Sequence, residues 1–158
     1  MSAQGFDTAS AYQAAFDTLL GAAGRQLCLY ERTLDDLHLE DPARHAALRA
    51  FCSGGGGRRL DILLDETDTL RARQPRLIGL LRDFGHVLSI RQADPEAARP
   101  DHGFAVADRR GVLKRFDKQS LRGSLDLDDP HAALLLHQEF DALWERAPVF
   151  VSATTLGL

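Results

Sequence analysis

The sequence predicts an α/β fold with a mixed, mainly parallel sheet flanked by helices and an appended antiparallel hairpin. Three apolar segments of strand length alternate with two segments of helical periodicity, the order that crossover connections produce. A later pair of apolar segments is separated only by a short turn, as in a hairpin. The 158 residues suffice for one domain with a substantial core and are too few for two ordinary domains.

Three segments have the length and composition of buried strands. The clearest is 59–65 (RLDILLD), which alternates in polarity and then becomes apolar, as strands near the middle of a sheet do. Segments 26–30 and 87–91 are shorter and similarly apolar. Because a helical segment separates each strand from the next, we expect all three to run parallel.

Four segments carry apolar residues at helical spacing. Two begin at an Asp-Pro pair, in which the aspartate caps the helix and the proline takes the first helical position. Two end at glycine, which accepts the backbone conformation common after a helix. The expected helices are 11–19, 42–52, 75–84 and 130–146.

The pattern changes after residue 103. Segments 104–108 and 112–116 are joined by Arg-Arg-Gly, which predicts a β-hairpin. Segment 149–151 is expected to be an extended tail or an edge strand. The chain is thus expected to consist of an N-terminal tail and helix (1–24), one α/β domain (25–147) and a C-terminal tail (148–158).

Charge and hydropathy exclude several classes of protein. No apolar run reaches the roughly 18 residues of a membrane span, and the first residues lack the pattern of a secretory signal. The formal net charge of −4 argues against broad nucleic-acid affinity, although a nucleic-acid ligand stays open. Cys28 and Cys52 have no CxxC spacing, so we expect buried free thiols in a cytoplasmic protein.

Polar side chains follow the three expected strands at their carboxyl ends. Glu31 and Arg32 follow the first strand, Asp65 follows the second, and Arg91 ends the third. Ligands of such sheets gather beyond these ends, and the guanidinium fork suits phosphate and carboxylate groups. We expect these residues to share one crevice edge and bind a ligand; the alternative is that they only cap or solvate the strand ends.

Other familiar chemistries have little support. The glycines at 54–57 follow a helix and enter a strand, the reverse of the order in a phosphate-binding loop, so a plain connection is expected. Histidines and cysteines do not fall at metal-ligand spacing, and neither a metal nor a cofactor is predicted. The candidate catalytic residues are His102, which precedes an expected strand, and Asp108, which ends it.

Several segments together resemble a phospholipase D-like domain reduced to a single half. Active members of that family carry the motif HxKxxxxD, in which the histidine attacks phosphorus, the lysine binds phosphate and the aspartate supports the histidine. The resemblance implies that two such halves face each other, here in a homodimer. It covers roughly residues 25–147 and rests on 27–30 (LCLY), 59–65 (RLDILLD), 87–91 (VLSIR), 102–108 (HGFAVAD) and 139–145 (EFDALWE).

The chain departs from the family motif in both registers that can be drawn. With His102 as the histidine, the lysine position holds Phe104 and the aspartate position holds Arg109. With Asp108 as the aspartate, the histidine position holds Asp101 and the lysine position holds Gly103. The Gly-Ser that follows in the family is also replaced. Because phosphoryl transfer depends on charge stabilisation, these losses predict little activity.

We therefore expect a degenerate, non-catalytic domain that binds a phosphate-bearing or otherwise anionic ligand, or a protein partner. The chain is also similar to an uncharacterised group of small bacterial proteins. A homodimer is expected, since a lone half exposes the face that its partner would cover. The expected anion contacts are Arg32, Arg91, Arg109 and Arg110, with Asp65 and Asp108 orienting them.

Two alternatives remain. The first is a residual phosphodiesterase in which His102 is the nucleophile of a homodimeric site. The second is an accessory domain of an acetyltransferase system, because some members of the similar bacterial group occur beside acetyltransferase domains.

Overall fold

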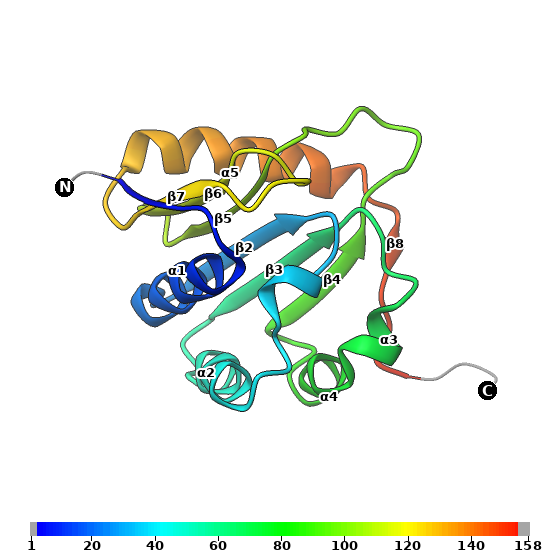
Figure 1. The fold of residues 1–158 in the computed structure, drawn as a ribbon. Helices are drawn as coiled ribbons and strands as arrows, with labels where there is room; N and C mark the ends of the chain where they lie inside the picture. The colour runs from blue at the N-terminus through cyan, green and yellow to red at the C-terminus, as the bar shows by residue number, and fades with distance from the viewer. Residues whose placement is uncertain (1–2, 155–158) are drawn as a thin grey trace.

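One sheet runs through the molecule and separates its helices into two layers (Figure 1). The computed structural model describes residues 3–154. Within them, eight strands lie in the order β1-β7-β6-β5-β2-β3-β4-β8. Their bounds are β1 Gln4–Phe6, β2 Gln26–Glu31, β3 Arg59–Leu64, β4 Leu88–Gln92, β5 Gly103–Ala107, β6 Gly111–Arg115, β7 Gly123–Asp126 and β8 Val149–Phe150.

Helices α1, α2 and α4 cover one face of the sheet, and α5 covers the other (Figure 1). As predicted, Asp41 and Asp129 cap α2 and α5 by accepting hydrogen bonds from backbone N–H groups three residues on. In the described part of the chain, no helix combines the length and apolarity that crossing a bilayer needs. The helices are α1 Ala9–Ala22, α2 Pro42–Cys52, α3 Leu70–Arg73, α4 Pro75–Asp83 and α5 Pro130–Glu145, with a 3₁₀ turn η1 at Asp35–Leu37.

The mixed α/β class and the appended hairpin are confirmed, but the expected balance of strand directions is wrong. β2, β3 and β4 are parallel as predicted, and β5 runs antiparallel beside β2. Two pairings among the described strands are parallel and five are antiparallel. The difference comes from the antiparallel β2–β5 pairing and from β1, β7 and β8, which have only two to four residues. β1 and β7 also lack the apolar runs that indicate a strand.

The central strands are buried on both faces, which explains their apolar sequences. In β2, Leu29 faces the layer of α1, α2 and α4, whereas Tyr30 faces α5. Because side chains alternate along a strand, Glu31 at the end of β2 falls on the first layer. Asp65, just beyond β3, falls on the side of α5, where it meets Tyr30.

Both expected tails contribute to the sheet. β1 pairs with β7, and α1 packs on the sheet through Tyr12, Phe16 and Leu19. β8 pairs with β4, so of the two structures expected for residues 149–151, an extended tail or an edge strand, the structure shows the edge strand. Residues 1–2 and 155–158 lie outside the described residues. The described parts of both tails therefore share one sheet with residues 25–147.

The hairpin of β5 and β6 turns tightly at Asp108 and Arg109. These residues have positive φ values of 54° and 58°, and the Arg110 N–H donates to the Ala107 carbonyl at 3.0 Å. This is the geometry of a type I′ turn, which suits the twist of paired strands and favours glycine, asparagine or aspartate. The turn lies one residue earlier than predicted, and it places Asp108 and Arg109 beside the start of β2.

The short strands at one end of the sheet depend on a glycine. A Cβ atom at Gly123 would overlap the Lys114 carbonyl and the Phe6 ring. We expect Gly123→Ala to lower the free energy of unfolding by about 1–3 kcal/mol, measured by urea denaturation. Gly21→Ala is the control, because its Cβ meets nothing within 4 Å. Equal stability of Gly123→Ala and wild type would contradict this close approach of β1, β6 and β7.

Candidate functional site

The carboxyl ends of the parallel strands form one edge of the sheet, which we call the carboxyl edge. The start of β5 and the loop between β6 and β7 also reach it, since the Lys118 N–H donates to the Asp101 carbonyl at 2.7 Å. As the sequence predicts, Glu31 and Asp65 both lie here. They belong to two polar clusters, one on each face of the sheet.

The first cluster surrounds Glu31, which is only 1% exposed. The Tyr12 hydroxyl donates to its Oε2 at 2.6 Å, and Arg115 donates to its Oε1 at 3.3 Å. Arg115 is 4% exposed and also donates to Asp36 at 2.7 Å. Burial raises the pKa of Glu31, while the hydrogen bond from Tyr12 and the charge of Arg115 oppose that rise. The guanidinium is thus held between two carboxylates of its own chain.

This cluster fills the space beside Gly103. A Cβ atom at that position would overlap the Glu31 carboxylate. Gly103 occupies the lysine position of the phospholipase D motif when Asp108 is taken as its aspartate. Any side chain at this position therefore requires the Glu31–Arg115 pair to move.

The second cluster surrounds Asp65. The Tyr30 hydroxyl donates to its Oδ1 at 2.7 Å, and Lys118 donates to its Oδ2 at 2.6 Å and to the Tyr30 oxygen at 2.8 Å. Arg99 lies 3.5 Å from the same carboxylate. Burial raises the pKa of Tyr30, and the hydrogen bond to Asp65 adds to that effect. Lys118 and Arg99 therefore share the Asp65 carboxylate.

His102 lies at the same edge, on the side of α5. Its Nε2 is 2.8 Å from Glu139 Oε1, and its ring lies 5.6 Å from the Phe104 ring. Asp108 does not assist it, because the two residues lie at opposite ends of β5. Six residues of extended chain separate them by roughly 20 Å. The two candidate catalytic residues therefore belong to different parts of the surface.

The expected convergence of Arg32 and Arg91 on this edge is not found. Arg32 forms an exposed pair with Glu66 at 3.5 Å. Arg91 lies between the Trp144 and Phe150 rings, with its guanidinium carbon 4.4 and 4.1 Å from their centroids, and donates to the Trp144 carbonyl at 2.9 Å. It serves to hold α5 and β8 on β4, because alternation along β4 directs its side chain to the α5 face.

Asp108 lies at the opposite edge, where β2 begins. Its carboxylate accepts three hydrogen bonds of 2.6–2.9 Å from the backbone N–H groups of residues 24–26. Partial burial opposes its ionisation, but these hydrogen bonds prevail and lower its pKa. Asp108 therefore anchors the connection from α1 to β2. Its neighbour Arg110 forms an exposed pair with Asp128 at 2.9 Å.

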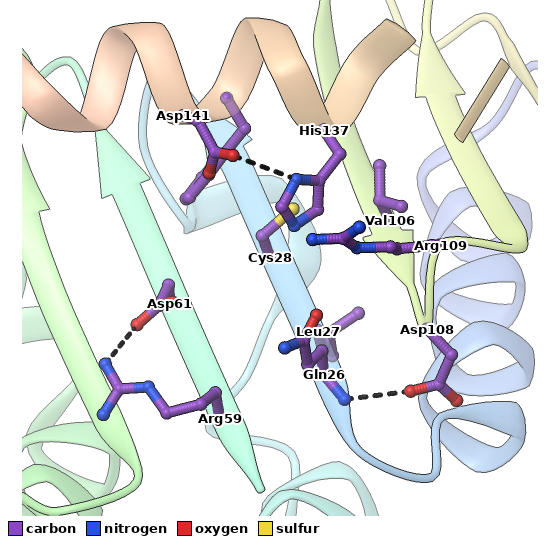
Figure 2. Close-up of a pocket in the computed structure, with 11 residues that line it drawn as sticks. Gln26, Leu27, Cys28, Arg59, Asp61, Val106, Asp108, Arg109, His137 and Asp141 are labelled. Carbon is purple, nitrogen blue, oxygen red and sulfur yellow. Dashed lines mark hydrogen bonds and ion pairs between the residues drawn. The ribbon is translucent and has the colours of Figure 1, made fainter. Parts of the chain in front are cut away.

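Arg109 extends from the same turn into a pocket under α5 (Figure 2). We call this the amino-edge pocket, because it lies where β2 and β3 begin. Its volume is about 250 Å³. Arg59 pairs with Asp61 at 2.9 Å and His137 pairs with Asp141 at 3.2 Å (Figure 2). The pocket is lined by Gln26, Leu27, Cys28, Arg59, Asp61, Val106, Asp108, Arg109, His137, Phe140 and Asp141.

The cysteines do not supply a nucleophile. Both are buried and free, and burial raises the pKa of Cys28 to about 12 and that of Cys52 to about 11. A thiol attacks as its thiolate, which these shifts suppress near neutral pH. Among the described residues, no three or more histidine, cysteine, aspartate or glutamate side chains gather so as to hold a metal ion.

A family model matches residues 8–152, nearly the whole chain. The chain belongs to the DUF7931 family. That family is described as a domain of unknown function, so membership brings no activity with it. No curated protein matches the chain by sequence.

Solved structures show the fold. The chain is similar to TrmBL2, an archaeal chromatin protein, at 18% identity and a TM-score of 0.66, over 93% of this chain and 51% of that one. NucT from Helicobacter pylori matches at 15% identity and a TM-score of 0.62, over 94% and 99% of the two chains. Nuc from Salmonella typhimurium, a phospholipase D family member, matches at 15% identity and a TM-score of 0.61, over 96% of this chain and 99% of Nuc. The fold is therefore phospholipase D-like, and the chain spans about half the length of TrmBL2.

The sequence did not reveal the partners of Glu31, Asp65 and His102 at the carboxyl edge. Arg115 follows Leu113 by two positions, so the alternation of β6 already placed it on a buried face. Lys118 is one of only two lysines, an isolated signal without a pattern. Glu139 has no signal, because its approach to His102 depends on how α5 crosses the sheet.

Arg115 is expected to be essential for stability. Its replacement in Arg115→Met leaves the buried Glu31 carboxylate without its cation, which should cost about 3–5 kcal/mol in urea denaturation. The control is Arg110→Met, which breaks an exposed pair and should change stability by no more than about 0.5 kcal/mol. Adding Glu31→Gln to Arg115→Met should recover part of the loss. Similar losses in both single variants would contradict the buried pair.

Asp108 should make stability depend on pH. Its folded pKa is lowered, so its contribution is present above the ordinary aspartate pKa near ~4 and is lost as pH falls through the lowered value. Asp108→Asn should cost about 1–3 kcal/mol at neutral pH. The gap from wild type should narrow in acid, measured by denaturation across pH. The exposed Asp7→Asn is the control, and a pH-independent gap would contradict the assignment.

Proposed function

We propose that this chain is a non-catalytic phospholipase D-like module that binds a small anionic ligand. The observation that carries this proposal is the Glu31–Arg115 pair in the space beside Gly103. In the register set by Asp108, that space belongs to the phosphate-binding lysine. A carboxylate now stands there, and a carboxylate repels a phosphate group.

The cations of the carboxyl edge support the same conclusion. Transfer of a phosphoryl group needs positive charge directed at the phosphate oxygens. Arg115 is held by Glu31 and Asp36, and Lys118 is held by Asp65. Binding a phosphate here would require these buried pairs to open, at a cost of several kcal/mol for each uncompensated charge.

A small anion fits the surface better than a nucleic acid does. The structure of TrmBL2 shows that one protein of similar fold binds DNA. Nucleic-acid affinity, however, requires many basic side chains free to contact phosphates. The net charge here is −4, and four of the exposed arginines, Arg32, Arg49, Arg73 and Arg110, each pair with a carboxylate.

A second candidate function, a residual phosphodiesterase, is favoured by the His102–Glu139 pair. A carboxylate at 2.8 Å from an imidazole is an arrangement that can orient a nucleophilic histidine. The hydrogen-bonded nitrogen is Nε2, which leaves only Nδ1 free to attack. Lys118 and Arg99 both lie against Asp65, so a phosphate would have to compete with that carboxylate for them. Two further expectations from the sequence stay predictions: that the protein forms a homodimer, and that it acts as an accessory domain of an acetyltransferase system.

Hydrolysis of bis(p-nitrophenyl) phosphate tests the proposal. We expect the purified protein to release p-nitrophenol no faster than its His102→Ala variant, because Arg115, Lys118 and Arg99 all lie against carboxylates at the carboxyl edge. A commercial phosphodiesterase serves as the positive control for the assay. Turnover that His102→Ala abolishes would overturn the proposal and establish the second candidate.

A further inference from the structure

The amino-edge pocket lies away from the carboxyl edge, on the face of the sheet covered by α5 (Figure 2). Cys28, Val106 and Phe140 supply its apolar side chains on the α5 face of the sheet, and charged groups line the rest. The volume of about 250 Å³ is just below the range of roughly 300–1,000 Å³ that drug-sized ligands occupy. It therefore suits a small metabolite.

Of the two arginines that line this pocket, Arg109 is the one without an ion pair within residues 3–154. Arg59 is balanced by Asp61, and His137 lies against Asp141. The Asp108 carboxylate is satisfied by three backbone N–H groups. Within the same residues, Arg109 has no ion pair or hydrogen bond from its side chain. Figure 2 shows its guanidinium extending over Cys28, below the His137 ring.

The backbone of Arg109 is strained because the type I′ turn places both of its central residues at positive φ. A φ of 58° is unfavourable for an arginine, since its Cβ crowds the backbone in the left-handed region. At Asp108 the equivalent strain is offset by the hydrogen bonds of the carboxylate. Nothing comparable offsets it at Arg109 in the described structure. The turn nevertheless holds an arginine at this position, and its side chain reaches the pocket.

Asp61 offers a second polar contact. It is partly buried, and its hydrogen-bond partner in the described structure is Arg59. Burial raises the pKa of Asp61, even though the charge of Arg59 opposes that rise. A carboxylate in this state gains from a further donor, which a ligand hydroxyl can supply.

We propose that the amino-edge pocket binds a small hydroxylated oxyanion. Its carboxylate or phosphate group lies against the Arg109 guanidinium, and its hydroxyl donates to the Asp61 carboxylate. This rests on the proposed function in one respect, that the module binds a small anion. It moves the binding site from the carboxyl edge to the opposite edge of the sheet.

Isothermal titration calorimetry with defined probes tests the site. L-malate represents hydroxylated carboxylates, glycerol 3-phosphate represents hydroxylated phosphates, and acetate lacks the hydroxyl group. We expect malate or glycerol 3-phosphate to bind more tightly than acetate, and the tighter of the two identifies the oxyanion. Arg109→Gln should weaken that binding about tenfold or more.

The matched control is Arg110→Gln, which removes the same charge from the next residue, outside the pocket. It should leave the dissociation constant unchanged. Equal weakening in both variants, or no binding of any probe at millimolar concentration, would overturn the inference. Neither result bears on phosphodiester turnover, so failure of this site and failure of the non-catalytic proposal are told apart.

A third variant separates ligand binding from folding. Arg109→Gly relieves the left-handed backbone, because glycine adopts positive φ without a steric penalty. We expect it to raise the midpoint of thermal unfolding and to abolish binding of the tighter probe. A lowered midpoint would mean that the arginine side chain stabilises the fold, and the inference would then be wrong.

Discussion

The buried ion pair of Glu31 and Arg115 organises the carboxyl edge of this sheet. Each charge is almost inaccessible to water, and an unpaired charge in such a place costs several kcal/mol, so neither residue is dispensable while the other remains. Tyr12 and Asp36 complete the cluster, which links α1, η1, β2 and β6. The pair also requires that Gly103 has no side chain. One electrostatic requirement thus determines both local stability and what this edge can bind.

A consequence is that the two edges of the sheet have different electrostatics. At the carboxyl edge, Glu31 of β2 lies against Arg115, and Asp65, just beyond β3, lies against Lys118 and Arg99, so these polar groups serve the fold. At the amino edge, Asp108 binds backbone while Arg109 extends into a pocket without a partner in the described structure. A phospholipase D-like scaffold can therefore keep its architecture while the charge available to a ligand lies elsewhere.

Much of the fold followed from patterns in the sequence, because buried strands and capped helices need particular residues at particular spacings. The apolar runs of β2, β3 and β4 and the Asp-Pro starts of α2 and α5 are local signals. The strands β1 and β7 were not predicted, since they are short and polar and exist only because a partner strand lies beside them. That difference is one reason why the sheet was expected to be mainly parallel.

The sequence by itself determined which residues stand at the ends of the parallel strands, and so placed Glu31 and Asp65 at one edge. Tertiary structure alone decided what meets them: Arg115 and Lys118 arrive from another hairpin. It also decided that His102 lies at this edge, where Glu139 meets it from α5. The physical reason is the distance along the sequence over which each effect acts. Strand and helix signals act over a few residues, whereas the compensation of a buried charge depends on groups that the chain brings together across dozens of positions.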